Sequence, residues 1–263
     1  MARVAALHRY PVKGFTPDSC SSLTVKPDGR IVGDRVLAFR MATATPGDGW
    51  APKANFVVMM NTPRLALLKL RYDDAACRLH ISHNGAKLAE GGLDEDGRAR
   101  LATAVSQYVL GLEESPVVGH PERLPLRLVG DGETPQFHDS REGRVTLHGR
   151  GSLASLGAAL GNGALNEHRF RTNVSVDGLA PWEELGWEGR RVRIGDVRFS
   201  VVRQLVRCLA THANPVTGQR DLPVLTTLTG AFSQERPTFG ISLVPDGPGG
   251  VLHVGDEVAV LDA

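Results

Sequence analysis

The sequence predicts a mainly β protein with a few helices, arranged as two closely packed barrel-like parts. Short apolar runs bounded by Gly, Pro, Asp and Asn recur along the 263 residues, as in strands joined by turns. Two stretches have the apolar spacing of helices, and they do not alternate with the strands as a doubly wound sheet requires. The length allows two small domains, which we place at residues 1–123 and 124–263.

The first half contains six predicted strands and one predicted helix. The strands are expected at residues 4–7, 22–25, 36–40, 65–72, 78–82 and 87–90, separated by turn residues. The helix is expected at residues 98–110, where Leu101, Val105 and Val109 share one face and Gly111 ends it. Pro121 and Pro125 mark the expected domain boundary.

The second half repeats this pattern. Residues 124–132 indicate a strand and a turn. A short helix is expected at residues 152–160, with Ser152 as its N-cap and Gly161 after its end. Further strands are expected at residues 173–176, 191–194, 197–206, 239–244 and 257–261.

Composition and charge are typical of a globular protein and argue against several functional classes. Hydrophobic residues make up 41% and charged residues 22%, and the formal net charge of +1 gives no broad field for nucleic acid or membranes. Three cysteines are too few for a disulfide framework and lack zinc-site spacing. The sequence has no signal peptide and no apolar run long enough to span a bilayer. We therefore expect a cytoplasmic, monomeric protein that binds neither nucleic acid nor membranes.

Cys208 is the cysteine with the most suggestive setting. It follows the predicted strand at residues 197–206, stands beside Arg207 and begins a loop rich in turn residues. Local features leave three interpretations open: a buried structural thiol, a nucleophile with His212 as its base, or a thiolate that binds a soft metal. Burial is the commonest fate of a free cysteine, so the structural interpretation comes first on these features alone.

Basic residues recur beside turns: Lys13, Arg35, Arg171 and Arg207. Each alone is typical of a solvated surface charge, but together they suit a phosphate if the fold brings the two halves together. His138-Asp139-Ser140 does not predict a catalytic triad, because consecutive strand residues point to opposite faces. The nine histidines show no metal-ligand spacing with carboxylates.

Six motifs in order give the chain a family resemblance. They are Tyr10-Pro11-Val12-Lys13-Gly14, Gly33-Asp34-Arg35, Phe137-His138-Asp139-Ser140, Arg169-Phe170-Arg171-Thr172-Asn173, Trp182-Glu183 with Arg193-Ile194-Gly195, and Arg207-Cys208 with Asn214-Pro215-Val216-Thr217-Gly218. Nearly the whole chain thus resembles the MOSC superfamily. The resemblance is to the branch with an N-terminal MOSC-associated β-barrel domain, which includes the mitochondrial amidoxime-reducing component and its bacterial relatives.

The resemblance implies a molybdenum cofactor of the molybdopterin type between a MOSC N-terminal β-barrel domain and a MOSC β-barrel domain. It implies that Cys208 is the metal ligand and a catalytic residue, together with Arg207 and Asn173. Cofactor-binding positions would be Lys13, Gly14, Arg35, Ser140, Arg171, Asn173 and Thr211. Pyridoxal phosphate binding remains a family-level alternative for the cofactor.

The implied activity is reduction of small N-hydroxylated compounds, such as amidoximes and hydroxylamino compounds, by oxygen-atom abstraction at molybdenum. No Cys-rich ferredoxin module follows, so we expect a separate electron-donor protein of iron–sulfur, flavin or haem type. The alternative is a sulfur-carrier or cofactor-binding module with a persulfide on Cys208 and no turnover. Gly14 stands where the amidoxime-reducing proteins have Ser, and Thr172 stands where the family has Pro.

Overall fold

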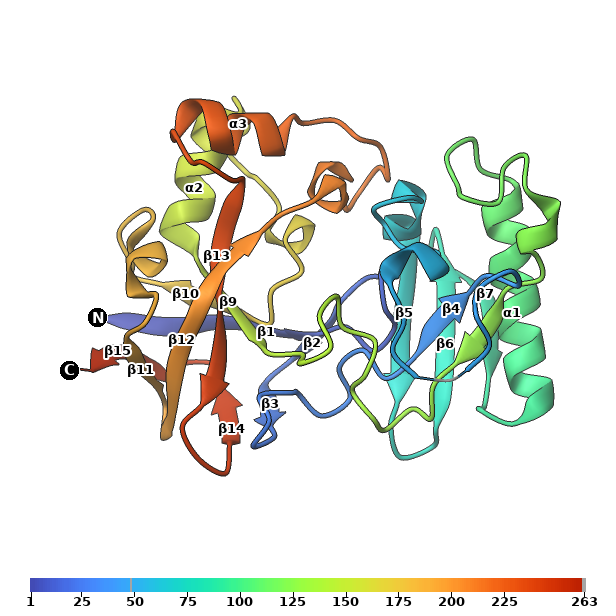
Figure 1. The fold of residues 1–263 in the computed structure, drawn as a ribbon, viewed down its shortest axis with the longest axis horizontal. Helices are drawn as coiled ribbons and strands as arrows, with labels where there is room; N and C mark the ends of the chain where they lie inside the picture. Colours follow the sequence, from blue (N-terminus) through green and yellow to red (C-terminus); the bar gives the residue numbers. More distant parts are fainter. Residues whose placement is uncertain (48, 262–263) are drawn as a thin grey trace.

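A closed sheet forms one half of the protein, and smaller sheets with one long helix form the other (Figure 1). The computed structural model describes residues 1–47 and 49–261. Strands outnumber helices throughout this part of the chain, which confirms the mainly β fold with a few helices. The first and the last described strands of the chain both belong to the closed sheet (Figure 1). None of the described helices is long and apolar enough to cross a membrane.

Seven strands close into a barrel in the order β10-β9-β13-β12-β11-β15-β1, because β1 also pairs with β10. The barrel strands are β1 (Ala2–Arg9), β9 (Val145–Gly149), β10 (Val174–Asp177), β11 (Arg191–Ile194), β12 (Val197–Val206), β13 (Thr238–Pro245) and β15 (Glu257–Leu261). β2 (Asp18–Cys20) extends the sheet from β1. β9 and β10 run parallel, and the other pairings in this sheet are antiparallel.

The N-terminal strand belongs to the barrel of the second half of the chain. Val4 of β1 lies opposite Val176 of β10, and both pack in one apolar cluster. The same cluster includes Leu23 of β3 (Ser22–Val25), which pairs with β14 (Gly250–His253). The division at residues 123 and 124 stays a prediction, and the strand pairing shows that it does not separate the two cores.

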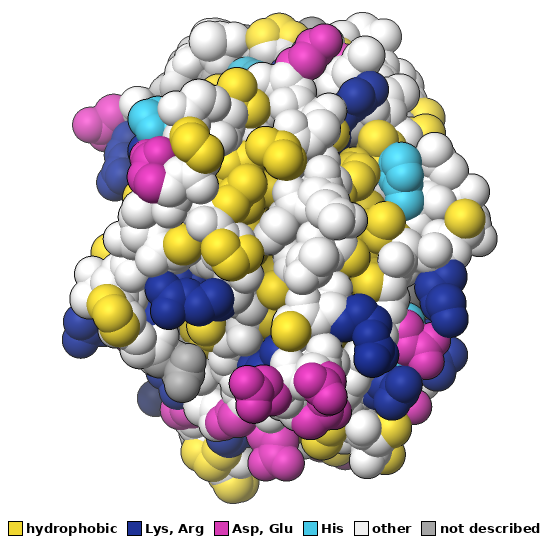
Figure 2. All heavy atoms as spheres, turned by 90° about the vertical axis from the view of Figure 1, so that its right-hand side faces the viewer, with side chains coloured by type: hydrophobic (Ala, Val, Ile, Leu, Met, Phe, Trp, Pro, Cys, Tyr) yellow, Lys and Arg dark blue, Asp and Glu magenta, His cyan; other side chains and the backbone are white. Residues whose placement is uncertain are grey.

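The other half holds a second apolar cluster between a three-stranded sheet and a helix. Its sheet has the order β5-β6-β7, and a separate pair joins β4 to β8. The elements are β4 (Ala38–Arg40), β5 (Leu68–Asp73), β6 (Arg78–His83), β7 (Ala86–Gly91), α1 (Glu95–Leu110) and β8 (Arg127–Val129). On the outer face shown in Figure 2, acidic and basic side chains both occur, so one sign of charge does not cover it.

The helices differ from the prediction in three ways. α1 begins earlier than residue 98, because the Asp94 carboxylate caps it by accepting from the Gly97 amide at 2.8 Å. α2 (Arg150–Ala159) has Gly149 at its N-cap, and Ser152 lies inside it, where its hydroxyl donates to Glu184. α3 (Val224–Ala231) was not predicted.

Short 3-10 helices connect several strands. They are η1 (Lys53–Asn55), η2 (Pro63–Leu67), η3 (Pro121–Arg123), η4 (Glu167–Arg169), η5 (Glu183–Trp187) and η6 (Leu209–His212). η2 replaces the first part of the strand predicted at residues 65–72, and Pro63 at its start has no amide hydrogen to give to a sheet. η4 directly precedes Phe170 and Arg171, and η6 directly follows Cys208; these residues line a cleft.

Candidate functional site

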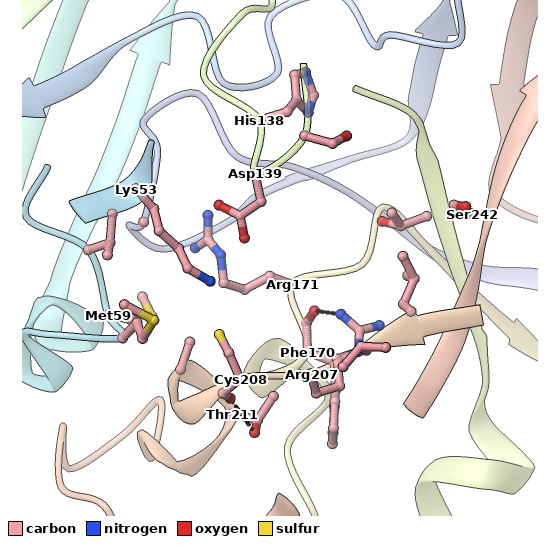
Figure 3. A pocket seen from close by; sticks show the side chains of 18 of the residues that line it. Lys53, Met59, His138, Asp139, Phe170, Arg171, Arg207, Cys208, Thr211 and Ser242 are labelled. Carbon is pink, nitrogen blue, oxygen red and sulfur yellow. Dashed lines mark hydrogen bonds between the residues drawn. The ribbon is translucent and has the colours of Figure 1, made fainter. Parts of the chain in front are cut away.

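A cleft of about 460 Å³ lies between the two halves of the protein (Figure 3). Nine Lys and Arg residues line it, against one acidic residue, Asp139. The nine are Lys13, Arg35, Lys53, Arg144, Arg169, Arg171, Arg203, Arg207 and Arg236. A cleft walled by one sign of charge concentrates ligands of the opposite sign, so this one favours an anion.

Cys208 lies where β12 ends, at the N-cap of η6, and its thiol points into the cleft (Figure 3). The thiols of Cys20 and Cys77 each donate to a backbone oxygen at 3.6 Å, whereas the Cys208 thiol has no hydrogen bond within the described residues. His212 does not pair with it, because His212 Nε2 accepts from the Leu225 amide at 3.3 Å. The half-buried thiol is therefore available to a ligand in the cleft.

Arg207 uses its guanidinium to hold the strand end that carries Cys208. Its Nε donates to the Phe239 carbonyl at 2.7 Å, and its Nη1 donates to the Phe170 carbonyl at 2.9 Å. The guanidinium also lies over both rings, 5.8 Å from Phe170 and 5.9 Å from Phe239. Burial lowers the pKa of Arg207 to about 10. These bonds join β12 to β13 and to the loop after η4.

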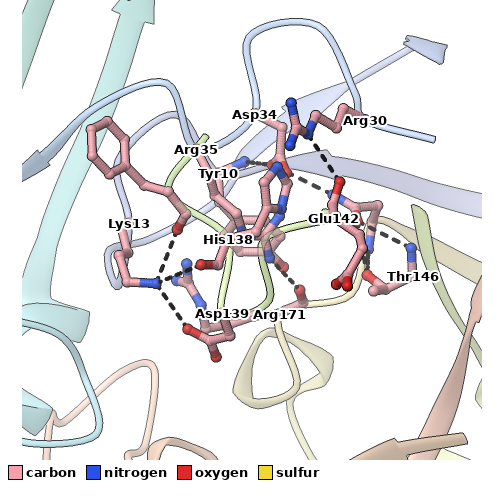
Figure 4. Close-up of polar contacts among 12 residues, drawn as sticks. Tyr10, Lys13, Arg30, Asp34, Arg35, His138, Asp139, Glu142, Thr146 and Arg171 are labelled. Carbon is pink, nitrogen blue, oxygen red and sulfur yellow. Dashed lines mark hydrogen bonds and ion pairs between the residues drawn. The ribbon is translucent and has the colours of Figure 1, made fainter. Parts of the chain in front are cut away.

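Two further arginines lie against the ring of Tyr10. The guanidinium carbons of Arg35 and Arg171 lie 4.9 and 4.4 Å from the ring centroid. Arg35 donates to the carboxylate of Asp34 and to the Arg171 carbonyl (Figure 4). Arg171 in turn donates to the Phe15 carbonyl. Burial, followed by the charge of Arg35, lowers the pKa of Arg171 to about 10.

Lys13 uses all three of its ammonium hydrogens inside the protein (Figure 4). Its Nζ donates to the carbonyls of Phe137 and His138 at 3.0 and 3.2 Å, and to the Asp139 carboxylate at 2.9 Å. Burial would raise the pKa of Asp139, but the Lys13 ammonium holds it well below its ordinary value. Burial and then the charge of Arg35 lower the pKa of His138 to about 4.

The remaining predicted cofactor residues have different surroundings. Gly14 lines the cleft at φ +79°, and a Cβ there would lie 2.6 Å from Val58, which explains why no serine fits. Ser140 lines the cleft. Thr211 also lines it, but its hydroxyl donates to the Cys208 carbonyl at 3.0 Å.

Asn173 is the predicted site residue that the structure does not place in the cleft wall. Its side chain is fully buried. Its Oδ1 accepts from the Thr146 hydroxyl at 2.8 Å, and its Nδ2 donates to the His8 carbonyl at 3.1 Å. The amide therefore joins β9 to β1 inside the barrel.

The nine cations divide into two sets. The bonded cations, Lys13, Arg35, Arg169, Arg171 and Arg207, all donate to groups of the protein itself. The side chains of the free cations, Lys53, Arg144, Arg203 and Arg236, make no hydrogen bond or ion pair within residues 1–47 and 49–261. Sequence reasoning missed the free cations. The one available signal was Arg203, which lies in the strand that leads to Cys208.

Comparison with known proteins gives two domain matches. A model of the MOSC N-terminal beta barrel domain matches residues 1–111, and a model of the MOSC domain matches residues 134–259. Proteins named molybdenum cofactor sulfurase are similar over shorter stretches. The protein from Caenorhabditis briggsae is 33% identical over 92 residues, which cover 34% of this chain and 13% of that protein. The protein from Drosophila grimshawi is 36% identical over 112 residues, which cover 42% of this chain and 14% of that protein.

The chain therefore spans only about a seventh of the length of these curated relatives. Among solved structures, the YuaD protein from Bacillus subtilis overlaps with a TM-score of 0.43 at 11% identity, covering 98% of this chain and 93% of that chain.

Proposed function

Because the chain belongs to the MOSC family, with a MOSC N-terminal beta barrel domain ahead of its MOSC domain, we propose that it is a molybdenum-cofactor-dependent reductase of N-hydroxylated compounds. The observation that carries this proposal is the unbonded Cys208 thiol in a cleft lined by nine cations and one carboxylate. A soft thiolate suits a sulfur-rich metal centre, and the cations suit a phosphate.

The residues of the cleft fit such a cofactor in chemistry and in charge. Cys208 would supply the metal ligand. The free cations Lys53, Arg144, Arg203 and Arg236 have all their side-chain donors available for the phosphate, whereas Lys13 would have to give up an existing bond. Lys13, Arg35 and Arg171 would instead act through their positive potential and hold the wall in place.

Bound between Cys208 and the cations of the cleft, the cofactor would supply the two-electron, oxygen-accepting chemistry that reduction of an N–O bond needs. The protein contributes position and charge. The Asp139 carboxylate is exposed to the cleft and stays ionised, so it can accept hydrogen bonds from the amino nitrogen of a substrate. Arg207 keeps Cys208 at its place by joining the end of β12 to Phe170 and Phe239. We expect the electrons to come from a separate donor protein.

Metal analysis and a reductase assay test this proposal together. After expression in a host that makes the cofactor, we expect the native chain to contain molybdenum and to oxidise a reduced viologen dye when benzamidoxime is added. The Cys208→Ala variant should lose both properties. The Cys77→Ala variant should keep both, because Cys77 does not line the cleft. Equal activity in Cys208→Ala, or folded native chain that takes up no molybdenum, would refute the proposal.

A second candidate function follows from the relatives, whose name is molybdenum cofactor sulfurase. Here the chain would bind the cofactor or carry a persulfide on Cys208 without reducing a substrate. A native mass spectrum distinguishes the two functions. Molybdenum-loaded chain without dye oxidation, or a gain of one sulfur atom that disappears in Cys208→Ala, would favour the carrier function.

A further inference from the structure

Three side chains from two distant segments meet beside the barrel, outside the cleft. They are His8, from β1, and Glu167 and His168, from η4. One ligand atom from each lies within 4.8 Å of the other two. His8 Nε2 and Glu167 Oε1 are 3.6 Å apart. Because His8 and Glu167 are 159 positions apart in the sequence, only the fold brings this group together.

The His8 ring nitrogen that faces this group is buried without a hydrogen-bond partner, and its contact with the Glu167 carboxylate is 3.6 Å long. His8 is 5% exposed, and its Nε2 has no hydrogen-bond partner within the described residues. Buried polar atoms in native proteins rarely remain unbonded. A separation of 3.6 Å is too long for a hydrogen bond to Glu167, but two ligands of one tetrahedral zinc ion lie about 3.3 Å apart at bond lengths of about 2.0–2.1 Å.

The surrounding groups orient the side chains as metal ligands are usually oriented. Ser19 Oγ lies 3.4 Å from His8 Nδ1, so an Nδ1–H can donate there and leave Nε2 free for a metal. Arg150 donates to both oxygens of Glu167, at 3.2 and 3.1 Å, and fixes the plane of the carboxylate. The other carboxylate oxygen, Glu167 Oε2, lies 3.6 Å from His148 Nε2, which is also buried without a hydrogen-bond partner.

The third ligand, His168, lies at the side of the group from which a metal ion could enter from solvent. His168 is half-buried, and its side chain makes no hydrogen bond within the part of the chain that the structure describes. Its ring packs edge-on against His8, with 4.8 Å between the centroids. Its ring can therefore turn toward the other two ligand atoms without the loss of a side-chain hydrogen bond.

We propose that His8, Glu167 and His168 bind one divalent transition-metal ion of the zinc type. Two imidazoles and a carboxylate are a common zinc ligand set, and a fourth position remains for water. The ion would join β1 to η4. Its ligand His8 lies two residues before Tyr10, and its ligand His168 lies directly before Arg169; both Tyr10 and Arg169 support the cleft wall. Its expected role is to stabilise this wall, and it is separate from any metal held by Cys208.

Calorimetric titration with zinc alone tests the proposal. The chain is stripped with a chelator and carries Cys208→Ala, so that the cleft thiol cannot bind the ion. We expect one zinc per chain and a rise in melting temperature that grows with the zinc concentration. His168→Ala should fold normally, since it loses no hydrogen bond, and should bind zinc at least tenfold more weakly. His8→Gln should do the same.

His80→Ala is the matched control. His80 also lies beside a carboxylate, with its Nδ1 3.4 Å from Glu90 Oε2, but on the surface of β6. It should leave zinc binding unchanged. Absence of stoichiometric binding, or equal zinc affinity in the His168→Ala and His80→Ala variants, would overturn the proposal. Because the readout is zinc binding without the cleft thiol, the result does not depend on the reductase activity.

Discussion

The bonded and free cations lie in the wall of one cleft, yet the fold uses them in opposite ways. Lys13 and Arg207 give their hydrogens to carbonyl and carboxylate groups of the protein, and burial lowers the pKa of each. Arg203 and Arg236 are exposed and make no such bonds within the described residues. The difference teaches that lining a cleft does not make a cation a ligand-binding group. The bonded cations build the wall, and the free cations can bind.

The largest test of this comparison uses two arginines on the same segment, four residues apart. Arg207→Ala leaves the carbonyls of Phe239 and Phe170 without their donor. At roughly 2 kcal/mol for each carbonyl, we expect the free energy of unfolding to fall by about 4 kcal/mol. Arg203→Ala removes no bond, so its change should stay within about 0.5 kcal/mol. Urea unfolding of the two variants measures both values, and equal losses would erase the distinction between the two sets.

The next test concerns pH, because the buried part of the wall contains His138. Burial and the charge of Arg35 lower the pKa of His138 from 6.5 to about 4. The unfolded chain therefore binds a proton at higher pH than the folded chain does. The stability that a neutral His138 contributes is present above pH 6.5 and is lost as the pH falls toward 4. The loss should reach about 3 kcal/mol over this range.

Replacement by a group that does not titrate isolates this effect. Urea unfolding at pH 7 and pH 4 gives the drop in the free energy of unfolding between these two values. We expect this drop to be about 3 kcal/mol smaller in His138→Gln than in the native chain. His80→Gln is the control, because His80 on β6 is only partly buried and lies outside the cleft. Parallel pH profiles for the native chain and His138→Gln would show that His138 is not the group responsible.

The sequence predicted the parts of this site that local patterns encode. Cys208 was placed correctly at the end of a strand, because an apolar run followed by Asn and Pro marks such an end. α3 was missed because its Thr residues are weak helix formers and its length is only eight residues. The pairing of β1 with β10 could not be predicted from the sequence, since no local pattern specifies a strand partner more than 150 residues away.

The direction in which each cationic side chain points could not be predicted from the sequence either. Lys13 and Arg35 were expected to bind the cofactor, but only the fold shows that their donors already meet Phe137, Asp139 and Arg171. Asn173 was expected beside the cofactor, and the barrel buries it instead. Its assignment as a catalytic or cofactor residue therefore stays a prediction that the hydrogen bonds to Thr146 and His8 do not favour.

The smallest expected effect tests the free cations directly. Two exposed arginines, Arg203 and Arg236, reach the cleft with unused donors, so we expect inorganic phosphate to bind there in the absence of cofactor. Arg203→Ala combined with Arg236→Ala should weaken this binding about tenfold, since each exposed contact contributes roughly 0.7 kcal/mol.

Isothermal titration at low and high salt measures this loss, and the native affinity should fall as salt rises because exposed charges are screened. Arg190→Ala is the control, because Arg190 is an exposed arginine outside the cleft. If the double variant and Arg190→Ala bind phosphate equally well, the free cations do not form the anion site. The bonded cations would then have to supply the anion site, and the division of the wall into two sets would fail.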